Sequence, residues 1–340
     1  MVDLSFVWAG IIAFAILAYV ILDGFDLGVG ILFPAIRPGS GMRSRMMNSI
    51  APVWDGNETW LVMGSGGLFA VFPLAYGIAL TALYVPIFAM LFGLVFRGVA
   101  FEFRWRVEER NKFYWDWAFI GGSYTAAFFQ GVALGALVQG IKVSDRAYAG
   151  GWWDWLTPFS LTCGLAVVIG YALLGATWLV MKTDGWLQRR MREYAWRAAF
   201  GTIFLIMVVS LWTPFHNPEY LTRWFSWPSV LYSAIVPFCM FVLTILLFAG
   251  LETQKDVQPF LCGLGIFFLC FVGIGISFYP QIIPPDIEIR EAAAPDKSLA
   301  FLLVGAAFML PVILTYTAFS YWVFRMRWPH PIDLRSSGLL

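Results

Sequence analysis

Nine long apolar runs divide this chain, and each has roughly the 20 residues that an α-helix needs to cross the hydrocarbon core of a bilayer. Backbone amides and carbonyls find no water inside a bilayer, so such runs are expected to be helical. The sequence therefore predicts an all-α polytopic membrane protein with nine transmembrane helices, and residues 1–340 form a single membrane domain. The expected spans are 5–32, 49–72, 76–100, 116–139, 158–181, 195–213, 229–250, 258–280 and 299–325.

The composition supports a membrane location. Hydrophobic residues make up 60% of the chain and charged residues 13%, whereas a soluble domain carries about 25% charged residues. The formal net charge is +1, and phosphate binding needs a clustered positive excess, so we expect the lipid bilayer and no nucleic acid as a partner. The four cysteines lie in apolar runs without CxxC spacing, which indicates neither a disulfide framework nor a zinc site.

The basic residues predict the orientation of the helices. Of the 22 lysines and arginines, 17 lie in one set of alternating loops or in the adjoining ends of the runs, and five lie in the other set. Basic residues concentrate on the cytoplasmic side of membrane proteins. The distribution therefore predicts an N-terminus outside the cell and a C-terminus in the cytoplasm.

Four acidic residues stand inside the first two apolar runs. Asp23 and Asp26 belong to LDGFDLGVG, and Asp55 and Glu58 belong to NSIAPVWDGNETW. Each pair has a spacing of three residues, which places both carboxyl groups on one helix face. Counted from the expected helix ends, all four lie roughly 10 to 15 Å deep near the cytoplasmic side. Four such charges cannot all stay ionised in a low dielectric, so at least one holds a proton or pairs with a cation.

Two interpretations of these acids remain open. An ionised side chain inside a bilayer costs about 2.5 kcal/mol or more and usually marks an ion or proton path, with Trp54, Asn57 and Trp60 as supporting residues. Alternatively, Asp55 and Glu58 cap a helix at the headgroup level. In the same way, the two acids of the first run could form a structural pair that is hydrogen-bonded to the backbone or to Trp N–H groups.

The sequence gives no sign of a complete catalytic site or of metal ligands. Haem proteins of membranes draw on histidines within their helices, but here His216 follows the sixth run and His330 lies in the C-terminal tail. No P-loop, GxSxG, HExxH or dinucleotide fingerprint is present. We therefore expect no haem or metal to be ligated by this chain.

The residues by themselves leave two classes of protein open. One is an accessory subunit of a redox complex that conducts protons. The other is a proton-coupled transporter that uses the same carboxylates, for which interrupted helices at Pro86, Pro237 and Pro311 would be suitable. The second half of the chain contains no matching pair of acids, which favours the redox subunit.

Three motifs in order resemble subunit II of the cytochrome bd-type quinol oxidases. They are LDGFDLGVG, NSIAPVWDGNETWL and RGVAFEFR, all within about the first hundred residues. The short loops resemble the branch called cyanide-insensitive oxidases. The resemblance implies two four-helix bundles plus a peripheral helix, in the cytoplasmic membrane of a bacterium.

The same resemblance implies the partners and the role of the site. Subunit I of the family carries the quinol site, two b-type haems and the d-type haem that reduces oxygen to water. Subunit II is its scaffold, so this chain would be a non-haem-ligating subunit of a quinol:oxygen oxidoreductase. The acid of the WDGN motif, Asp55, would serve a cytoplasmic proton path with Asp26 as its neighbour. A structural quinone and a small single-helix subunit are further candidate components that we place on no residue.

Overall fold

The protein is described by a computed structural model that covers residues 3–39 and 41–324. Most of this part is helical, as predicted, and the exceptions to an all-α fold include two short antiparallel hairpins. The helices are α1 (Leu4–Leu32), α2 (Met42–Ile50), α3 (Trp54–Val71), α4 (Pro73–Ala82), α5 (Tyr84–Phe103), α6 (Lys112–Gln139), α7 (Pro158–Lys182), α8 (Gly185–Trp212), α9 (Pro218–Phe225), α10 (Ser229–Glu252), α11 (Gln258–Phe278), α12 (Ile289–Ala292) and α13 (Asp296–Val323). The antiparallel strand pairs are β1 (Val143–Ser144) with β2 (Ala147–Tyr148), and β3 (Gln281–Ile283) with β4 (Ile287–Glu288).

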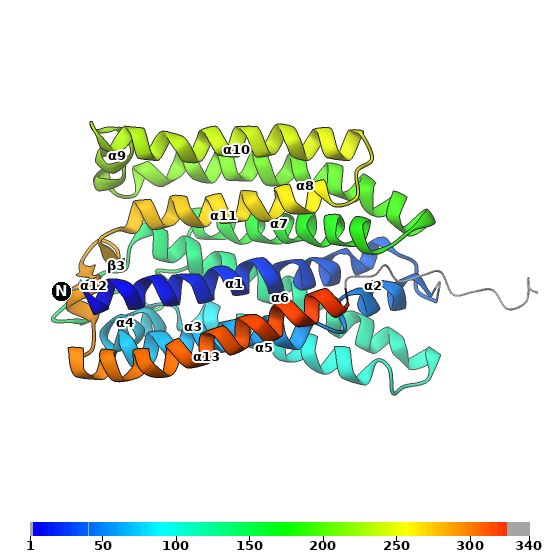
Figure 1. The fold of residues 1–340 in the computed structure, drawn as a ribbon, viewed down its shortest axis with the longest axis horizontal. Coiled ribbons are helices and arrows are strands. Elements are labelled where there is room, and N and C mark those ends of the chain that lie inside the picture. Colours follow the sequence, from blue (N-terminus) through cyan, green and yellow to red (C-terminus); the bar gives the residue numbers. More distant parts are fainter. Residues whose placement is uncertain (1–2, 40, 325–340) are drawn as a thin grey trace, which may run out of the picture.

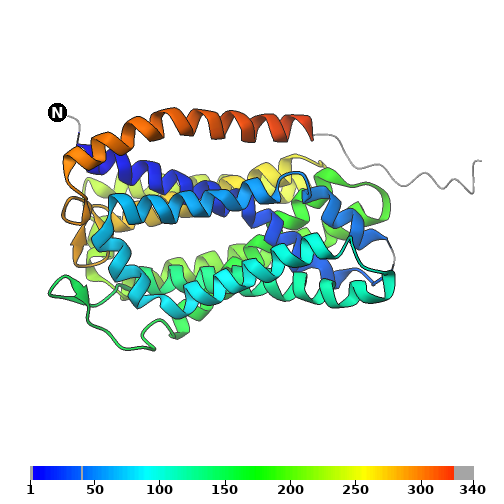
Figure 2. The same ribbon diagram turned by 90° about the horizontal axis from the view of Figure 1, so that it is seen from below.

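The long helices form two groups that lie side by side. Helices α1, α3, α5 and α6 make one group, and α7, α8, α10 and α11 make the other (Figure 1). Packing of α1 and α6 against α7 joins the groups. Helix α13 runs along the outside of the first group, as Figure 2 shows. This arrangement matches the expected pair of four-helix bundles with a peripheral helix.

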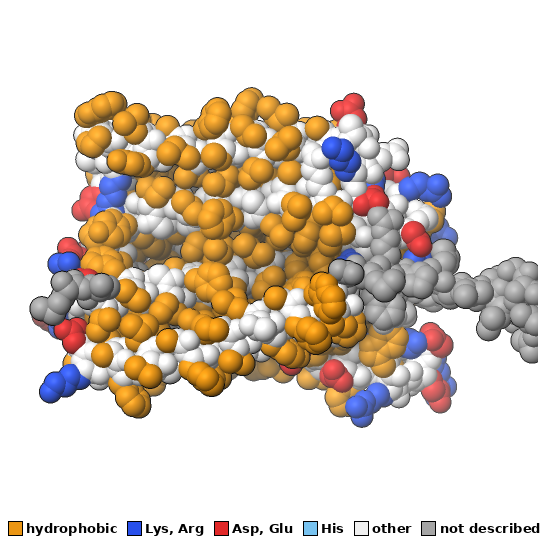
Figure 3. All heavy atoms as spheres, viewed as in Figure 1, with side chains coloured by type: hydrophobic (Ala, Val, Ile, Leu, Met, Phe, Trp, Pro, Cys, Tyr) orange, Lys and Arg blue, Asp and Glu red, His pale blue; other side chains and the backbone are white. Residues whose placement is uncertain are grey.

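Hydrophobic side chains cover the middle of the face seen in Figure 3, and charged side chains gather toward its two ends. Within the described residues, seven helices are long and apolar enough to cross a membrane, or up to eight if a bent pair counts as one span. Helix α6, with 28 residues, covers the predicted fourth span but is not among those seven. The protein is thus polytopic, and the count of nine spans stays a prediction.

The predicted single helix over 76–100 is wrong. Helix α4 is bent by 120° from α3, and a second break at Leu83 separates α4 from α5. Pro73 suits the first position of α4, where a missing N–H costs nothing. Pro86 cannot donate to the carbonyl of Ala82, which removes a helical hydrogen bond at the second break. Helix α4 consequently lies across the end of the molecule where α1 begins (Figure 2).

The predicted helix over 49–72 also begins later than expected. Residues up to Ile50 belong to α2, a turn covers 51–53, and α3 begins at Trp54. Pro52 lies in that turn, and the residue before a proline is disfavoured in helical geometry. The WDGN motif therefore forms the first turn of α3 and does not lie two turns inside it.

Glycines bring the helices of the two groups into backbone contact. A Cβ atom at Gly28 of α1 would lie 1.9 Å from the carbonyl oxygen of Tyr171 in α7, and one at Gly175 would lie 2.3 Å from the carbonyl carbon of Gly28. Similarly, a Cβ atom at Gly131 of α6 would lie 2.5 Å from the carbonyl oxygen of Cys163 in α7. Small residues at these positions permit close helix packing in membranes. These contacts fix the rotation of α1 about its axis, and with it the direction of the helix face that carries Asp23 and Asp26.

Candidate functional site

The two acids of α1 lie fully inside the protein. Asp23 and Asp26 both have exposed fractions of 0%. They follow each other by one turn on the buried part of the helix, so both carboxyl groups face neighbouring helices instead of lipid. A buried carboxylate requires hydrogen bonds or a cation to offset its lost hydration. The structure supplies both.

Arg97 of α5 is the cation. Its side chain is also completely buried, and its Nη2 forms an ion pair with Oδ1 of Asp23. The same Nη2 lies 3.7 Å from Oε2 of Glu58, and the guanidinium lies over the ring of Trp54 at 5.6 Å. The sequence predicts that at least one acid holds a proton or pairs with a cation, and Arg97 provides the cation for Asp23 and Glu58.

Asn57 of α3 holds the second acid. Its Nδ2 donates to Oδ2 of Asp26 at 2.7 Å and to the backbone carbonyl of Leu22 at 3.2 Å. Its Oδ1 accepts a hydrogen bond from the hydroxyl of Tyr321 in α13, at 2.9 Å. The side-chain amide of Asn57 is therefore fully used, and it connects three helices.

Asp55 and Glu58 differ in their surroundings. Glu58 belongs to the cluster through Arg97, and its side chain is 28% exposed. Asp55 lies in the first turn of α3 and is exposed. Asp55 therefore differs from the other three acids, because it is exposed and makes no ion pair with Arg97 in the described part of the chain, while the common depth of the four carboxyl groups stays a prediction. An acid in the first turn is also favoured by the helix dipole, as the capping interpretation expected.

The tryptophans of the motif act through packing. Trp54 lies against Phe101, with ring centroids 5.0 Å apart. Trp60 is buried and makes an edge contact with Phe14 at 5.7 Å. Neither the Nε1 of Trp60 nor that of Trp54 donates to the acids of α1 in the described part of the chain. The alternative in which Trp N–H groups hold the acids is not realised there.

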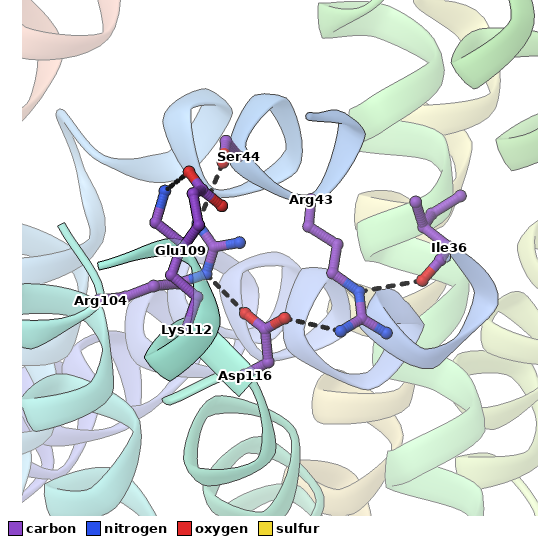
Figure 4. A network of polar contacts seen from close by, with 7 residues as sticks. All are labelled: Ile36, Arg43, Ser44, Arg104, Glu109, Lys112 and Asp116. Carbon is purple, nitrogen blue, oxygen red and sulfur yellow. Dashed lines mark hydrogen bonds and ion pairs between the residues drawn. The ribbon is translucent and has the colours of Figure 1, made fainter. Parts of the chain in front are cut away.

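A second polar network lies near the first turn of α6 (Figure 4). Asp116 accepts from Nη1 of Arg43 at 2.7 Å and from Nε of Arg104 at 2.5 Å. Arg43 Nε also donates to the carbonyl of Ile36 at 2.9 Å, and Arg104 Nη1 donates to Ser44 at 3.1 Å. These buried contacts tie α2, the end of α5 and the start of α6 together.

Sequence reasoning assigned Arg43, Arg97 and Arg104 to loops because basic residues mark the cytoplasmic side. All three are buried. One signal could have identified Arg97, because the expected span 76–100 already contained it, and an arginine within a span requires an acid as partner. For the other two, no such signal was present in the sequence.

His216 follows the end of α8, and its ring packs against the rings of Phe159 and Trp212, with centroid distances of 4.5 and 6.4 Å. That this chain ligates no haem stays a prediction. Burial also lowers the pKa of His216. His330, the C-terminal tail and its arginines lie outside the described residues. Within the described residues, no group of three His, Cys, Asp or Glu side chains could hold a metal ion.

The fold and the cluster together define a class. This is a polytopic helical membrane protein with a buried ion pair between α1 and α5, a second buried acid on α1 and a partly exposed acid on α3. Residues 4–324 match the family described as cytochrome bd terminal oxidase subunit II. The chain belongs to that family.

Individual relatives agree with this assignment. The chain is 29% identical to cytochrome bd-I ubiquinol oxidase subunit 2 of Escherichia coli K12, over 94% of this chain and 93% of the relative. It is 28% identical to cytochrome bd ubiquinol oxidase subunit 2 of Bacillus subtilis, over 97% and 98%. The fold is similar to that in the structure of bd oxidase from Geobacillus thermodenitrificans, with a TM-score of 0.77, 18% identity and coverage of 94% and 98%.

Proposed function

We propose that this chain is the scaffold of a haem-bearing subunit I and supplies part of the proton path for the reduction of oxygen to water. Its relatives in Escherichia coli and Bacillus subtilis are each subunit 2 of a ubiquinol oxidase, so the chain is a component of an oxidoreductase complex. Reduction of oxygen consumes protons, and a haem buried in a membrane needs a route for them. In this chain, such a route could run along three acids that are exposed to solvent to different degrees.

The graded exposure of three acids is the observation that carries this proposal. Asp55 is exposed, Glu58 is 28% exposed at its side chain, and Asp26 is fully buried. They lie on the adjacent helices α3 and α1, which pack against each other. A proton taken up by Asp55 from water would pass to Glu58 and on toward Asp26.

Asp23 has a different part in this scheme. Its carboxylate offsets the charge of Arg97, so the pair stays fixed while protons move. Asp26 and Glu58 are then the groups left to exchange protons inside the cluster. Since Arg97 also lies near Glu58, its charge keeps that carboxylate close to the buried acids.

The redox chemistry belongs to the partner in this proposal. Two b-type haems and one d-type haem in subunit I would transfer electrons from quinol to oxygen, and this chain would complete no catalytic site of its own. The family resemblance adds a structural quinone and a small single-helix subunit, whose sites we leave unplaced. The transporter alternative is not favoured, because the family and its relatives are oxidase subunits.

The cluster lies toward the end of the molecule that we infer to be cytoplasmic. Arg43, Arg45 and Arg104 lie at that end, near the turn that precedes α3. The opposite end holds Asp3 and Arg290, which form an ion pair at 2.7 Å. With the predicted orientation, Asp55 meets cytoplasmic water, as a proton inlet must.

Asp55→Asn tests the path in the purified complex. The change keeps size and hydrogen bonding but removes the titrating group, so haem content stays at the wild-type level while quinol-driven oxygen uptake falls about tenfold or more. Glu252→Gln is the matched control, because Glu252 is an exposed acid at the end of α10 far along the chain from the cluster. Wild-type turnover of Asp55→Asn between pH 6 and 9 would refute the path. Loss of the haems would assign Asp55 to assembly.

A further inference from the structure

Tyr321 connects the peripheral helix to the buried cluster. Helix α13 lies outside the first helix group, and only 6% of an apolar stretch of 18 of its residues is buried within the chain. Near its end, however, the Tyr321 hydroxyl donates to Oδ1 of Asn57 at 2.9 Å. The Tyr321 ring meets the rings of Phe25 and Trp178 edge-on, with centroids 6.5 and 6.4 Å away. An otherwise exposed helix thus reaches the cluster through one side chain.

A second contact fixes this part of α13. Lys182, the last residue of α7, donates from Nζ to the carbonyl oxygen of Phe324 at 2.8 Å. Phe324 is the residue that follows α13. Tyr321 is therefore held by its ring, by its hydroxyl and by the fixed end of its helix, so its hydroxyl has a defined direction.

The Asn57 amide has two chemically different ends. Its NH₂ group only donates, and its oxygen only accepts. The carbonyl of Leu22 only accepts, so the NH₂ group is turned toward it and toward Oδ2 of Asp26, and the oxygen is left to accept from the Tyr321 hydroxyl. A flipped amide would set its oxygen against the oxygens of Asp26 and against that carbonyl.

We propose that Tyr321 is a positioning residue, which holds the oxygen end of the Asn57 amide so that its NH₂ group stays on Oδ2 of Asp26. This inference rests on the proposed role of Asp26 in proton transfer. Helix α13 thereby controls the hydrogen bonding of an acid that it does not touch directly. Asp26 is also surrounded by Asp23 on its own helix, Glu58 on α3 and Arg97 on α5.

Infrared difference spectra of the purified complex test this role. The band of the Asp26 carboxyl group is identified by its loss in Asp26→Asn. In Tyr321→Phe, which keeps the ring contacts but removes the donor, we expect that band to change position. Tyr316→Phe is the control, since Tyr316 lies on α13 with 66% of its side chain exposed, and it should leave the band in place. An unmoved band in Tyr321→Phe would overturn the proposal.

Two further measurements cover the other outcomes. One applies if Tyr321→Phe fails to assemble. Difluorotyrosine at position 321 keeps the ring and the hydroxyl and donates more strongly, so it should move the Asp26 band. An unmoved band would refute the role.

The other applies if no band disappears in Asp26→Asn. The turnover rates of Tyr321→Phe, Asn57→Ala and the double variant are then compared. We expect the double variant to be no slower than Asn57→Ala, and an additive loss would overturn the proposal. A normal Asp55→Asn enzyme would refute the proton path but would leave the band result valid.

Discussion

Arg97 of α5 and Asp23 of α1 form an ion pair with no exposed surface on either side chain, across 74 positions of sequence. Helices α1 and α5 belong to the same four-helix group, and α6 packs against both. Removing one member of a buried pair leaves an uncompensated charge, whereas removing both leaves none. Substituting these two residues singly and together therefore tests whether the cluster holds the first helix group together.

We expect Asp23→Asn and Arg97→Met each to lower stability of the complex by about 3 to 5 kcal/mol, because each leaves a buried charge unpaired. The double variant should recover part of that loss. Glu58→Gln is the control and should cost less, since Glu58 is partly exposed and lies 3.7 Å from Arg97. Thermal unfolding of the detergent-purified complex measures all four. Equal stability of the singles and the double would contradict this account.

Gly28→Ala should strongly reduce the amount of folded protein. The added Cβ would lie 1.9 Å from the carbonyl oxygen of Tyr171, so α1 and α7 would have to separate, at a cost of about 1 to 3 kcal/mol or more. Gly10→Ala is a matched control on the same helix, because a Cβ there meets nothing within 4 Å. Membrane fractions probed by immunoblot and by thermal unfolding give the answer. Comparable yields of the two variants would show that the contact is more compliant than the structure indicates.

We predict that this chain binds no haem when it is expressed without its partner, because its one described histidine, His216, follows the end of α8 and packs against two aromatic rings. A reduced-minus-oxidised spectrum of the isolated chain should be flat. In the complete complex, His216→Ala should keep the full haem content. A stoichiometric haem signal from the isolated chain would disprove the assignment of haems to subunit I.

Reporter fusions should alternate along the chain if the predicted orientation is correct. We expect fusions after Arg110, Arg146, Gln254 and Arg290 to report inside, outside, inside and outside. The structure joins two of these sites, since Arg146 pairs with Glu291 at 3.2 Å, so both must report the same side. Two neighbouring fusions on one side would require a different topology.

Much of the fold was predictable because the length of an apolar run sets a membrane helix almost independently of its neighbours. The start of α3 was not, because Pro52 breaks the helix inside a segment whose composition remains helical. Because of that break, Asp55 lies in the first turn of α3, where it is exposed. The resemblance to oxidase subunit II, in contrast, rested on short motifs and was confirmed over residues 4–324.

The partners of the acids were the harder part of the site. The basic residues were used to predict which side of the membrane is cytoplasmic. Because that rule treats every arginine as solvated, it could not distinguish the buried Arg97 from the exposed Arg110. Tyr321 lies 264 positions from Asn57, and nothing in the pattern of an outer helix indicates which of its side chains turns inward. Such contacts depend on packing between helices, which local sequence does not specify.

The glycine contacts between α1 and α7 also limit how the subunit can move. Transporters built from two helix groups work by rocking one group against the other around a central site. Here backbone atoms of Gly28 lie next to those of Gly175, so at this point no side chain stands between α1 and α7 that could change rotamer. Rocking one group against the other would have to break this contact. The proposed proton path would therefore rely on small rotations of side chains and would leave the helices where they are.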